Sequence, residues 1–305
     1  MNLGFDLGGT QIKAGLVDEN GRVTNMLRAP TPANLPDFQA VLQRITRELV
    51  AEQDISGVGF ASKGIIDFES TRVIANPGPT DFLEHHTLAG LIESVLPQGC
   101  KVRGDNDARA ALAGEVAYGA ARGHKDVLFF TLGTGVGGGI LANGQIVRGA
   151  GGIAGHLGHV SVNPNGAACL CGGRGCLETV FSARAIESAS DEVIHRGVDT
   201  KLRQVATRPP SCADVFALAR EGDEIAKQIL HRAIEALGAA IAGLIHAFDP
   251  EVIILGGQIA EAGEFLFVPL QKEITWRTAK FIRRSITLKR AEVTDGIVGA
   301  AALLR

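Results

Sequence analysis

Four potential metal ligands lie close together near the middle of the chain. His159 is followed by Cys169, Cys171 and Cys176, with glycines at most of the positions around the cysteines. One imidazole and three thiolates suit tetrahedral Zn²⁺, and a set without an open position for water would hold a structural ion. The Cys-x-Cys spacing is tighter than in the usual zinc finger. The alternative is that these cysteines are small buried apolar residues.

Two glycine-rich segments repeat one pattern about 125 residues apart. Residues 5–10 read FDLGGT and residues 130–135 read FTLGTG, and an Asn-Gly pair follows each, at 20–21 and 143–144. Without Cβ atoms, backbone N–H groups can close on phosphate oxygens, and a threonine hydroxyl adds a donor. The alternative is a plain hairpin bend. Neither segment has the spacing of a P-loop, and neither opens an evident helix as a dinucleotide-binding turn would.

The repeat also predicts how the chain is organised. Asn-Gly pairs favour type I′ turns, so each copy should form a strand, a glycine turn, a strand, a tight turn and a strand. Two such copies imply two similarly built α/β domains. We expect an N-terminal domain at 1–120, joined by a closing helix at 294–305, and a C-terminal domain at 121–293 with a zinc loop at 156–178.

Apolar periodicity places the remaining elements. It predicts helices at 36–53, 107–118, 224–248 and 296–304, and short strands at 57–61, 101–103 and 252–255. Asp107 falls at or near the N-cap of its helix. The last of the strands stops at Gly256 and Gly257, which form a third glycine turn.

Composition narrows the classes of function. The 305 residues include 30 basic and 33 acidic side chains without a Lys/Arg block, so we expect no nucleic-acid partner. The longest apolar run, 236–245, is half of the roughly 20 residues that a membrane span requires. No secretory signal is visible, which favours a cytoplasmic protein without a membrane partner. In that reducing compartment the clustered cysteines favour a metal, and Cys100 and Cys212 are expected in the core.

Taken together, these segments resemble the ROK family of sugar kinases and sugar-responsive repressors. The matching motifs are DLGGT at 6–10, NDA at 106–108, LGTGVGGG at 132–139, GHLGH at 155–159, CLCG at 169–172 and GCLE at 175–178. The resemblance implies the actin-like, ribonuclease-H-like ATPase fold, with two α/β domains around a cleft and a zinc-bound loop. Repressors of the family carry an N-terminal helix-turn-helix, whereas the first phosphate strand here starts at Asn2, which favours a kinase.

The resemblance also implies roles for individual residues. Asp107 would be the catalytic base that takes a proton from a sugar hydroxyl as it attacks the γ-phosphate of ATP. Asp6 would hold Mg²⁺ directly or through water. The nucleotide would be bound by Gly8, Gly9, Thr10, Lys13, Gly133, Thr134, Gly135, Gly256 and Gly257. The sugar would be bound by Gly64, Asn76, Asn106, Asp107, His156, His159 and Glu178.

Two departures from the family pattern bear on phosphate and sugar binding. Gln11 stands where most relatives have lysine, so either Lys13 or Mg²⁺ alone would balance the phosphate charge. His156 stands where most relatives, including typical glucokinases, have glutamate, and N-acetylmannosamine kinases of the family often have histidine. The segments around Lys63 and Gly133 differ from the usual versions in those kinases.

We therefore expect transfer of the γ-phosphate of Mg-ATP to the 6-hydroxyl of an aldohexose of the glucose type. The alternative is an N-acetylmannosamine or N-acetylglucosamine kinase. A sugar-sensing regulator without a DNA-binding domain, or a binding protein of the same fold, is a more remote alternative. The resemblance further implies a homodimer.

Overall fold

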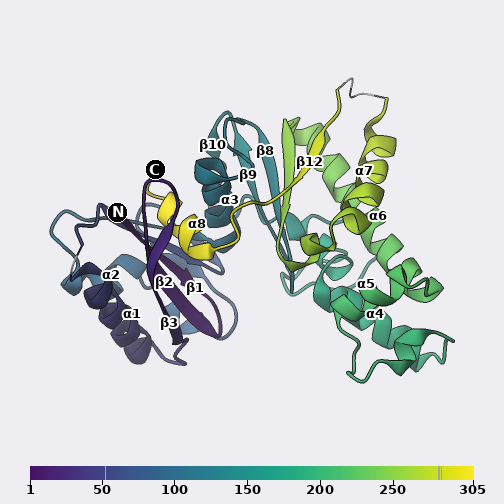
Figure 1. Cartoon of the computed structure of the whole chain (residues 1–305), viewed down its shortest axis with the longest axis horizontal. Helices are drawn as coiled ribbons and strands as arrows, with labels where there is room; N and C mark the ends of the chain where they lie inside the picture. Colours follow the sequence, from purple (N-terminus) through teal and green to yellow (C-terminus); the bar gives the residue numbers. More distant parts are fainter. Residues whose placement is uncertain (52, 281, 283) are drawn as a thin grey trace. The chain divides into compact units, whose positions relative to one another are not determined.

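The chain folds as two compact α/β units (Figure 1). The computed structural model describes residues 1–51, 53–280, 282 and 284–305. The first unit comprises residues 1–125, 139–155 and 291–305, and the second comprises 126–138 and 156–290. Residues 139–155 pack with the first unit, although the sequence-based boundary assigned them to the C-terminal domain. The limits of the functional domains stay a prediction.

Each of two five-stranded sheets begins with a glycine hairpin. The first sheet contains β1 (Asn2–Leu7), β2 (Gln11–Val17), β3 (Val23–Pro30), β4 (Gly57–Ser62) and β7 (Lys101–Asn106), in the order β3-β2-β1-β4-β7. The other contains β8 (Val127–Leu132), β9 (Val136–Ala142), β10 (Gln145–Ile146), β11 (Val252–Gly256) and β12 (Thr287–Arg290), in the order β10-β9-β8-β11-β12. The two orders are equivalent, which confirms the predicted duplication.

The tight turns of the two copies differ. Asn143 and Gly144 have φ of 51° and 76°, as the predicted type I′ turn requires. The same prediction is wrong at Asn20, because only Gly21 of that pair has a positive φ, of 82°. There the Asp18 carboxylate accepts the N–H groups of Asn20 and Arg22, and a three-residue loop with glycine in the left-handed position closes the hairpin.

The first unit buries one face of its sheet under α1 (Leu35–Val50), which Asn34 caps. Phe5 and Phe60 stack in that core at 5.1 Å between ring centroids. The other elements are α2 (Leu88–Ile92), α3 (Asp107–Tyr118), α8 (Gly296–Ala302), the small hairpin of β5 (Ile65–Ile66) and β6 (Val73–Ala75), and the 3-10 helices η1 (Asp81–Leu83) and η2 (Glu93–Val95). Predicted helix 36–53 ends at Val50, and residue 52 lies outside the described residues.

Strand β7 is longer than predicted. The expected span of 101–103 extends to Asn106 because each residue pairs in parallel register with β4, Gly104 with Phe60 and Asp105 with Ala61. Residues with low β propensity are therefore held in the strand by a neighbour on the sheet. This extension brings Asp105 and Asn106 to the sheet edge directly before α3.

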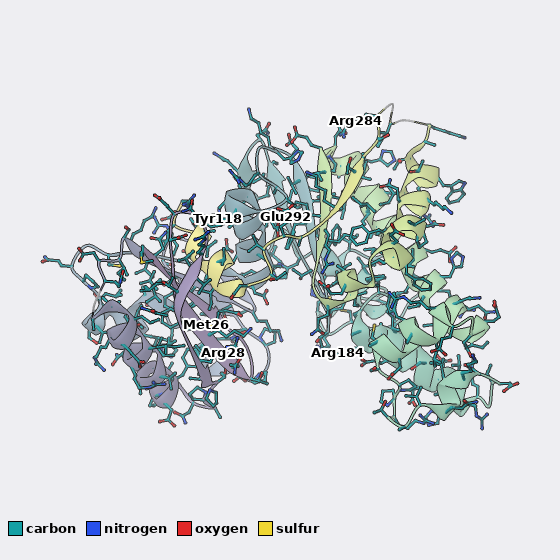
Figure 2. The ribbon with its side chains drawn as sticks, in the orientation of Figure 1. Met26, Arg28, Tyr118, Arg184, Arg284 and Glu292 are labelled. Carbon is teal, nitrogen blue, oxygen red and sulfur yellow. The ribbon has the colours of Figure 1, made fainter. Side chains whose placement is uncertain are left out.

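The second unit is built around α6 (Glu224–Phe248), whose predicted limits are confirmed. Its neighbours are α5 (Cys212–Arg220) and α7 (Glu264–Thr278), and α4 (Ala183–His195) packs beside them. The unit also has 3-10 helices η3 (Leu157–His159), η4 (Leu177–Thr179), η5 (Lys201–Gln204) and η6 (Gln258–Ala262). Arg284, labelled in Figure 2, donates to the Asp249 carboxylate at 2.6 Å and fastens the segment before β12 to the end of α6.

Helix α6 is the one described helix that is long and apolar enough to cross a membrane by length and composition. However, 61% of its most apolar window is buried inside the unit. Gly238 lets the helix approach α7, because a Cβ atom there would lie 2.7 Å from Cβ of Glu273. Helix α6 is therefore a core helix of this unit.

Helix α8 lies so close to the first sheet that Gly59 has no room for a side chain. A Cβ atom at Gly59 would lie 1.8 Å from the Ala300 carbonyl oxygen. We expect Gly59→Ala to lower the free energy of unfolding by about 1–3 kcal/mol, the usual cost of overpacking. The control is Gly243→Ala on an exposed face of α6, where a Cβ atom meets nothing within 4 Å. Urea denaturation should show a lower midpoint for the first variant only, and equal midpoints would contradict the packing argument.

Candidate active site and metal centre

The first glycine turn joins β1 to β2 in the first unit. The Gly8 N–H donates to the Gln11 carbonyl oxygen at 3.1 Å, and the Thr31 hydroxyl donates to the Gly8 carbonyl oxygen at 2.7 Å. A Cβ atom at Gly8 would lie 2.8 Å from that Gln11 oxygen. These two hydrogen bonds hold the backbone of Gly8 in place, while Gly9 and Thr10 are exposed to solvent.

Asp6, at the end of β1, lies in a concentration of negative charge. Burial raises the pKa of its carboxyl group, the Lys13 ammonium 3.4 Å away lowers it, and the charges of Asp107 and Asp295 raise it further. A Cβ atom at Gly296 would lie 2.7 Å from the Asp6 carboxylate. A partly buried carboxylate with further negative charge near it suits a hard divalent cation such as Mg²⁺, which prefers oxygen ligands.

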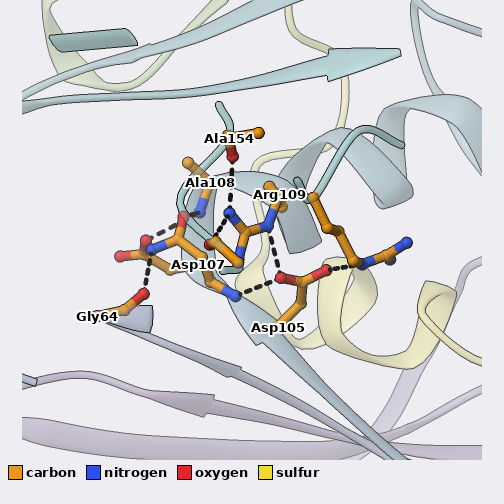
Figure 3. Close-up of polar contacts among 9 residues, drawn as sticks. Gly64, Asp105, Asp107, Ala108, Arg109 and Ala154 are labelled. Atoms are coloured by element: carbon orange, nitrogen blue, oxygen red, sulfur yellow. Dashed lines mark hydrogen bonds and ion pairs between the residues drawn. The ribbon is translucent and has the colours of Figure 1, made fainter. Parts of the chain in front are cut away.

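Four of the predicted sugar residues gather in the first unit. Asn106 caps α3 by accepting the Ala108 N–H at 3.0 Å, and its amide donates to the Gly64 carbonyl oxygen at 3.0 Å (Figure 3). Asp107 is the first residue of the helix and is exposed, although Asn106 before it is buried. The N-cap is thus Asn106, which leaves the Asp107 carboxylate on the surface.

Gly64 and Asn76 meet at the base of the small hairpin. Gly64 has a φ of +95°, and a Cβ atom there would lie 2.2 Å from the Ala75 carbonyl oxygen. The Asn76 amide donates to the Thr80 carbonyl oxygen at 2.8 Å, while its own side-chain oxygen is buried without a partner among the described residues. The side-chain oxygen of Asn76 can therefore accept a hydrogen bond from a ligand close to Gly64.

In the second unit, Glu178 holds the second glycine turn. Its carboxylate accepts the Val136 N–H at 2.8 Å, directly after the turn of residues 133–135. A Cβ atom at Gly135 would lie 2.4 Å from the same carboxylate oxygen. Gly257, with a φ of +83°, packs as closely against the Leu132 carbonyl oxygen. The structure therefore brings the predicted sugar residue Glu178 together with the predicted nucleotide residue Gly135, and packs the third glycine turn against the end of the strand before the second turn.

The four predicted metal ligands converge in the second unit. The donor atoms of His159, Cys169, Cys171 and Cys176 all lie within 4.8 Å of one another. The Nδ1 of His159 lies 3.6 Å from Sγ of Cys169, and the sulfurs of Cys171 and Cys176 are also 3.6 Å apart. Zinc bonds of about 2.3 Å to sulfur and about 2.0 Å to nitrogen give donor separations of about 3.5–3.8 Å in a tetrahedron. The arrangement fits zinc.

The charge state of the cluster would change when a cation binds. Burial, followed by the neighbouring cysteines, raises the pKa of Cys176 to about 12, whereas a hydrogen bond from the Gly173 backbone is the main cause that lowers the pKa of Cys171. Three thiolates at this separation would repel one another, and a bound divalent ion removes that repulsion. Cys100 and Cys212 lie outside the cluster, and Cys212 is buried as predicted.

His156 and His159 come from one short segment around η3. Their rings stack at 6.3 Å between centroids, and the His159 N–H donates to the His156 carbonyl oxygen at 3.0 Å. Because Nδ1 of His159 faces Cys169, Nε2 is the nitrogen that is left for another partner.

The predicted site residues therefore form two groups. Asp6, the first glycine turn, Lys13, Gly64, Asn76, Asn106 and Asp107 belong to the first unit, and His156, His159, Glu178 and the two other glycine turns belong to the second. Sequence reasoning missed Asp105, Arg109 and Arg148, which form a network beside Asp107 in which Asp105 and Arg109 are fully buried. The available signal was an Asp–Arg pair four residues apart at the start of a helix.

Comparison with known proteins defines the class. The family model described as "ROK family" matches residues 2–305, and the chain belongs to the ROK family. It is 37% identical to a glucokinase of Thermotoga maritima, over 99% of this chain and 96% of that protein. It is also 30% identical to an N-acetylmannosamine kinase of Salmonella heidelberg, over 99% and 97% of the two chains.

A solved relative has the same fold and carries ligands. The ROK family glucokinase of Streptomyces griseus, in complex with glucose and AMPPNP, superposes with a TM-score of 0.80 at 31% identity. The alignment covers 99% of this chain and 98% of that chain. The predicted actin-like fold is thereby confirmed for both sheets.

The metal centre gives a prediction that does not depend on catalysis. We expect the purified protein to carry about one zinc per chain and Cys176→Ser to lose it, because three donors do not close the tetrahedron. Cys100→Ser, outside the cluster, should keep the metal. Elemental analysis measures the zinc content. Thermal unfolding measures the effect of zinc on stability. Full zinc in the Cys176 variant would contradict the assigned ligand set.

Proposed function

We propose that the protein is an ATP-dependent hexose kinase that phosphorylates the 6-hydroxyl of an aldohexose of the glucose type. The observation that carries the proposal is the exposed carboxylate of Asp107, held at the first residue of α3 by the buried cap Asn106. A carboxylate in this position can accept a proton from a bound hydroxyl. The sequence similarity to glucokinases supports the choice of substrate class.

The proposed reaction needs little covalent chemistry from the protein. The Asp107 carboxylate takes the proton of the sugar 6-hydroxyl. The hydroxyl oxygen bonds to the γ-phosphorus, and the bond from that phosphorus to the bridging oxygen of ADP breaks. Positioning and charge neutralisation supply most of the rate in phosphoryl transfer. Asn106 and Gly64, joined by a hydrogen bond of 3.0 Å, would orient the sugar beside the base.

Phosphate binding falls to the glycine turns. Gly8, Gly9, Thr10, Gly133, Thr134 and Gly135 would bind the phosphates, while Gly256 and Gly257 would lie against the adenosine. Bound Mg²⁺ would neutralise phosphate charge. Asp6 is the residue that would hold it. Lys13 lies 3.4 Å from Asp6 and supplies a positive charge near the turn in the absence of a lysine at position 11.

His159 would link zinc to the sugar. One ring nitrogen faces the cysteines, so the metal would fix the tautomer and leave Nε2 for a sugar hydroxyl. Glu178 and His156 complete the proposed set in the second unit. A zinc-free protein that stays folded should therefore have a higher KM for the sugar.

The catalytic role of Asp107 is tested by Asp107→Asn. The amide keeps the size of the side chain but is not a base, so turnover should fall by about 10²–10⁴-fold, the usual worth of general-base catalysis. Nucleotide binding and the unfolding midpoint should be unchanged. Asp54→Asn, at an exposed position away from the proposed site, is the control. Turnover close to that of the wild type in the Asp107 variant would refute the role.

Sugar selectivity is tested by ADP release with Mg-ATP and glucose, mannose, fructose, N-acetylglucosamine and N-acetylmannosamine in turn. We expect glucose to give the highest kcat/KM. His156→Glu should then raise the ratio for glucose over N-acetylmannosamine, because it restores a fixed negative acceptor. A preference of the wild type for an N-acetylated sugar would favour the alternative and make His156 its determinant. Absence of turnover with every sugar would contradict the kinase proposal.

Cytoplasmic location and assembly as a homodimer accompany this proposal as predictions. The sugar and ATP would be its small-molecule partners.

A further inference from the structure

We propose that Arg109 is a positioning residue that fastens the glycine-rich segment 149–154 beside Asp107 and thereby sets how well, and how selectively, the sugar binds. The inference rests on the proposed function for its kinetic consequence. The attachment of segment 149–154 to Arg109 rests on contacts within the first unit alone.

The network centres on the carboxylate of Asp105, at the end of β7. One oxygen accepts Nε of Arg109 at 2.6 Å and the Asn106 N–H at 2.8 Å, and the other accepts Nε of Arg148 at 2.7 Å. The side chains of Asp105 and Arg109 are both 0% exposed. Asp105 therefore joins the strand before the base, the helix after it and the start of the 149–154 segment.

Arg109 extends this network to the far end of the segment. Its Nη1 donates to the carbonyl oxygens of Gly152 at 2.9 Å and Ala154 at 2.8 Å (Figure 3). Arg148, at the near end, has its guanidinium 3.6 Å from the centroid of the Phe68 ring. The segment is thus held at both ends by guanidinium groups that share one carboxylate.

Stability alone does not account for such an arrangement. A buried Asp–Arg pair recovers little more than the cost of removing both charges from water, and well-packed apolar side chains often do as well. Here two guanidiniums share one carboxylate, and Nη2 of Arg109 is buried without a partner among the described residues. The pair fixes the position of the backbone, because the rigid planar guanidinium of Arg109 can bond to a carboxylate and to two carbonyl oxygens in fixed directions.

The segment needs such a fastening because of its composition. Residues 149–155 read GAGGIAG, and Gly149, Gly152 and Gly155 have positive φ. Glycine lowers the cost of alternative backbone conformations, so the segment would otherwise sample many of them. The next residue in the chain is His156, at which the sugar selectivity is proposed to reside. Fixing the carbonyls of Gly152 and Ala154 therefore limits the positions that His156 can take.

The test is Arg109→Lys. A lysine keeps the positive charge beside Asp105, but one ammonium nitrogen cannot span the carboxylate and both carbonyls. Hydrogen exchange of the variant without ligands should be faster at the amides of 149–155, because their anchoring is lost. With sugar and ATP we expect kcat/KM for the sugar to fall about tenfold or more, since misplacement by about 1 Å can cost 10²-fold. KM for ATP should not change, and the ratio between glucose and N-acetylmannosamine should shift.

The matched control is Arg103→Lys. Arg103 also comes from β7 and also lies over Phe68, at 5.5 Å from the ring centroid, but its guanidinium pairs with Glu69 and donates to the Val102 carbonyl oxygen instead of to the segment. It should leave exchange at 149–155, sugar selectivity and KM for ATP unchanged. An equal effect of both substitutions would overturn the proposal, because it would then report a general loss of stability.

Hydrogen exchange and sugar kinetics test the two parts of the proposal separately. Faster exchange with unchanged sugar kinetics would overturn the positioning role, and unchanged exchange would overturn the fastening. If the wild type turns over no sugar, the proposed function fails, while the exchange experiment still decides the fastening. If Arg109→Lys does not yield folded protein, Arg148→Lys, whose side chain is 28% exposed, applies the same readouts to the other anchor.

Discussion

Each unit depends on backbone approaches that leave no room for a Cβ atom. Helix α8 can lie on the first sheet because Gly4 and Gly59 present bare backbone to the carbonyls of Ile297 and Ala300. In the second unit, Gly135 and Gly257 allow a carboxylate and a strand end to close on the turns in the same way. Several of the 39 glycines among the 305 residues therefore serve close backbone packing rather than conformational freedom.

These approaches place rigid, buried groups directly beneath exposed ones. Asp105 and Asn106 are buried, and the next residue, Asp107, is exposed. The first glycine turn is bonded from below through Gly8, while Gly9 and Thr10 lie at the surface. The zinc-ligand cluster follows the same arrangement, since Cys176 is buried and Cys171 is exposed. Groups that are proposed to meet a substrate are thereby fixed without being enclosed.

The sequence carried more about architecture than about contacts. The repeated FDLGGT and FTLGTG segments predicted the duplicated sheet because the hairpin pattern is local, and the limits of α3 and α6 followed from capping and periodicity. The Asn20 turn and the extension of β7 were missed because Asp18 and the register with β4 decide them. Arg109 was missed for a related reason. Its carbonyl partners lie more than 40 residues away, and no local pattern reports such a bond.

Glu178 has a consequence for how selectivity in such a protein can change. Its carboxylate accepts the Val136 N–H and fills the space beside Gly135, so the same oxygen shapes a turn that would face phosphate. Under the proposed function, a substitution there would alter sugar recognition and nucleotide binding together. Position 178 would therefore be constrained by two substrates at once, and a change of sugar that passes through it would also have to preserve the nucleotide turn.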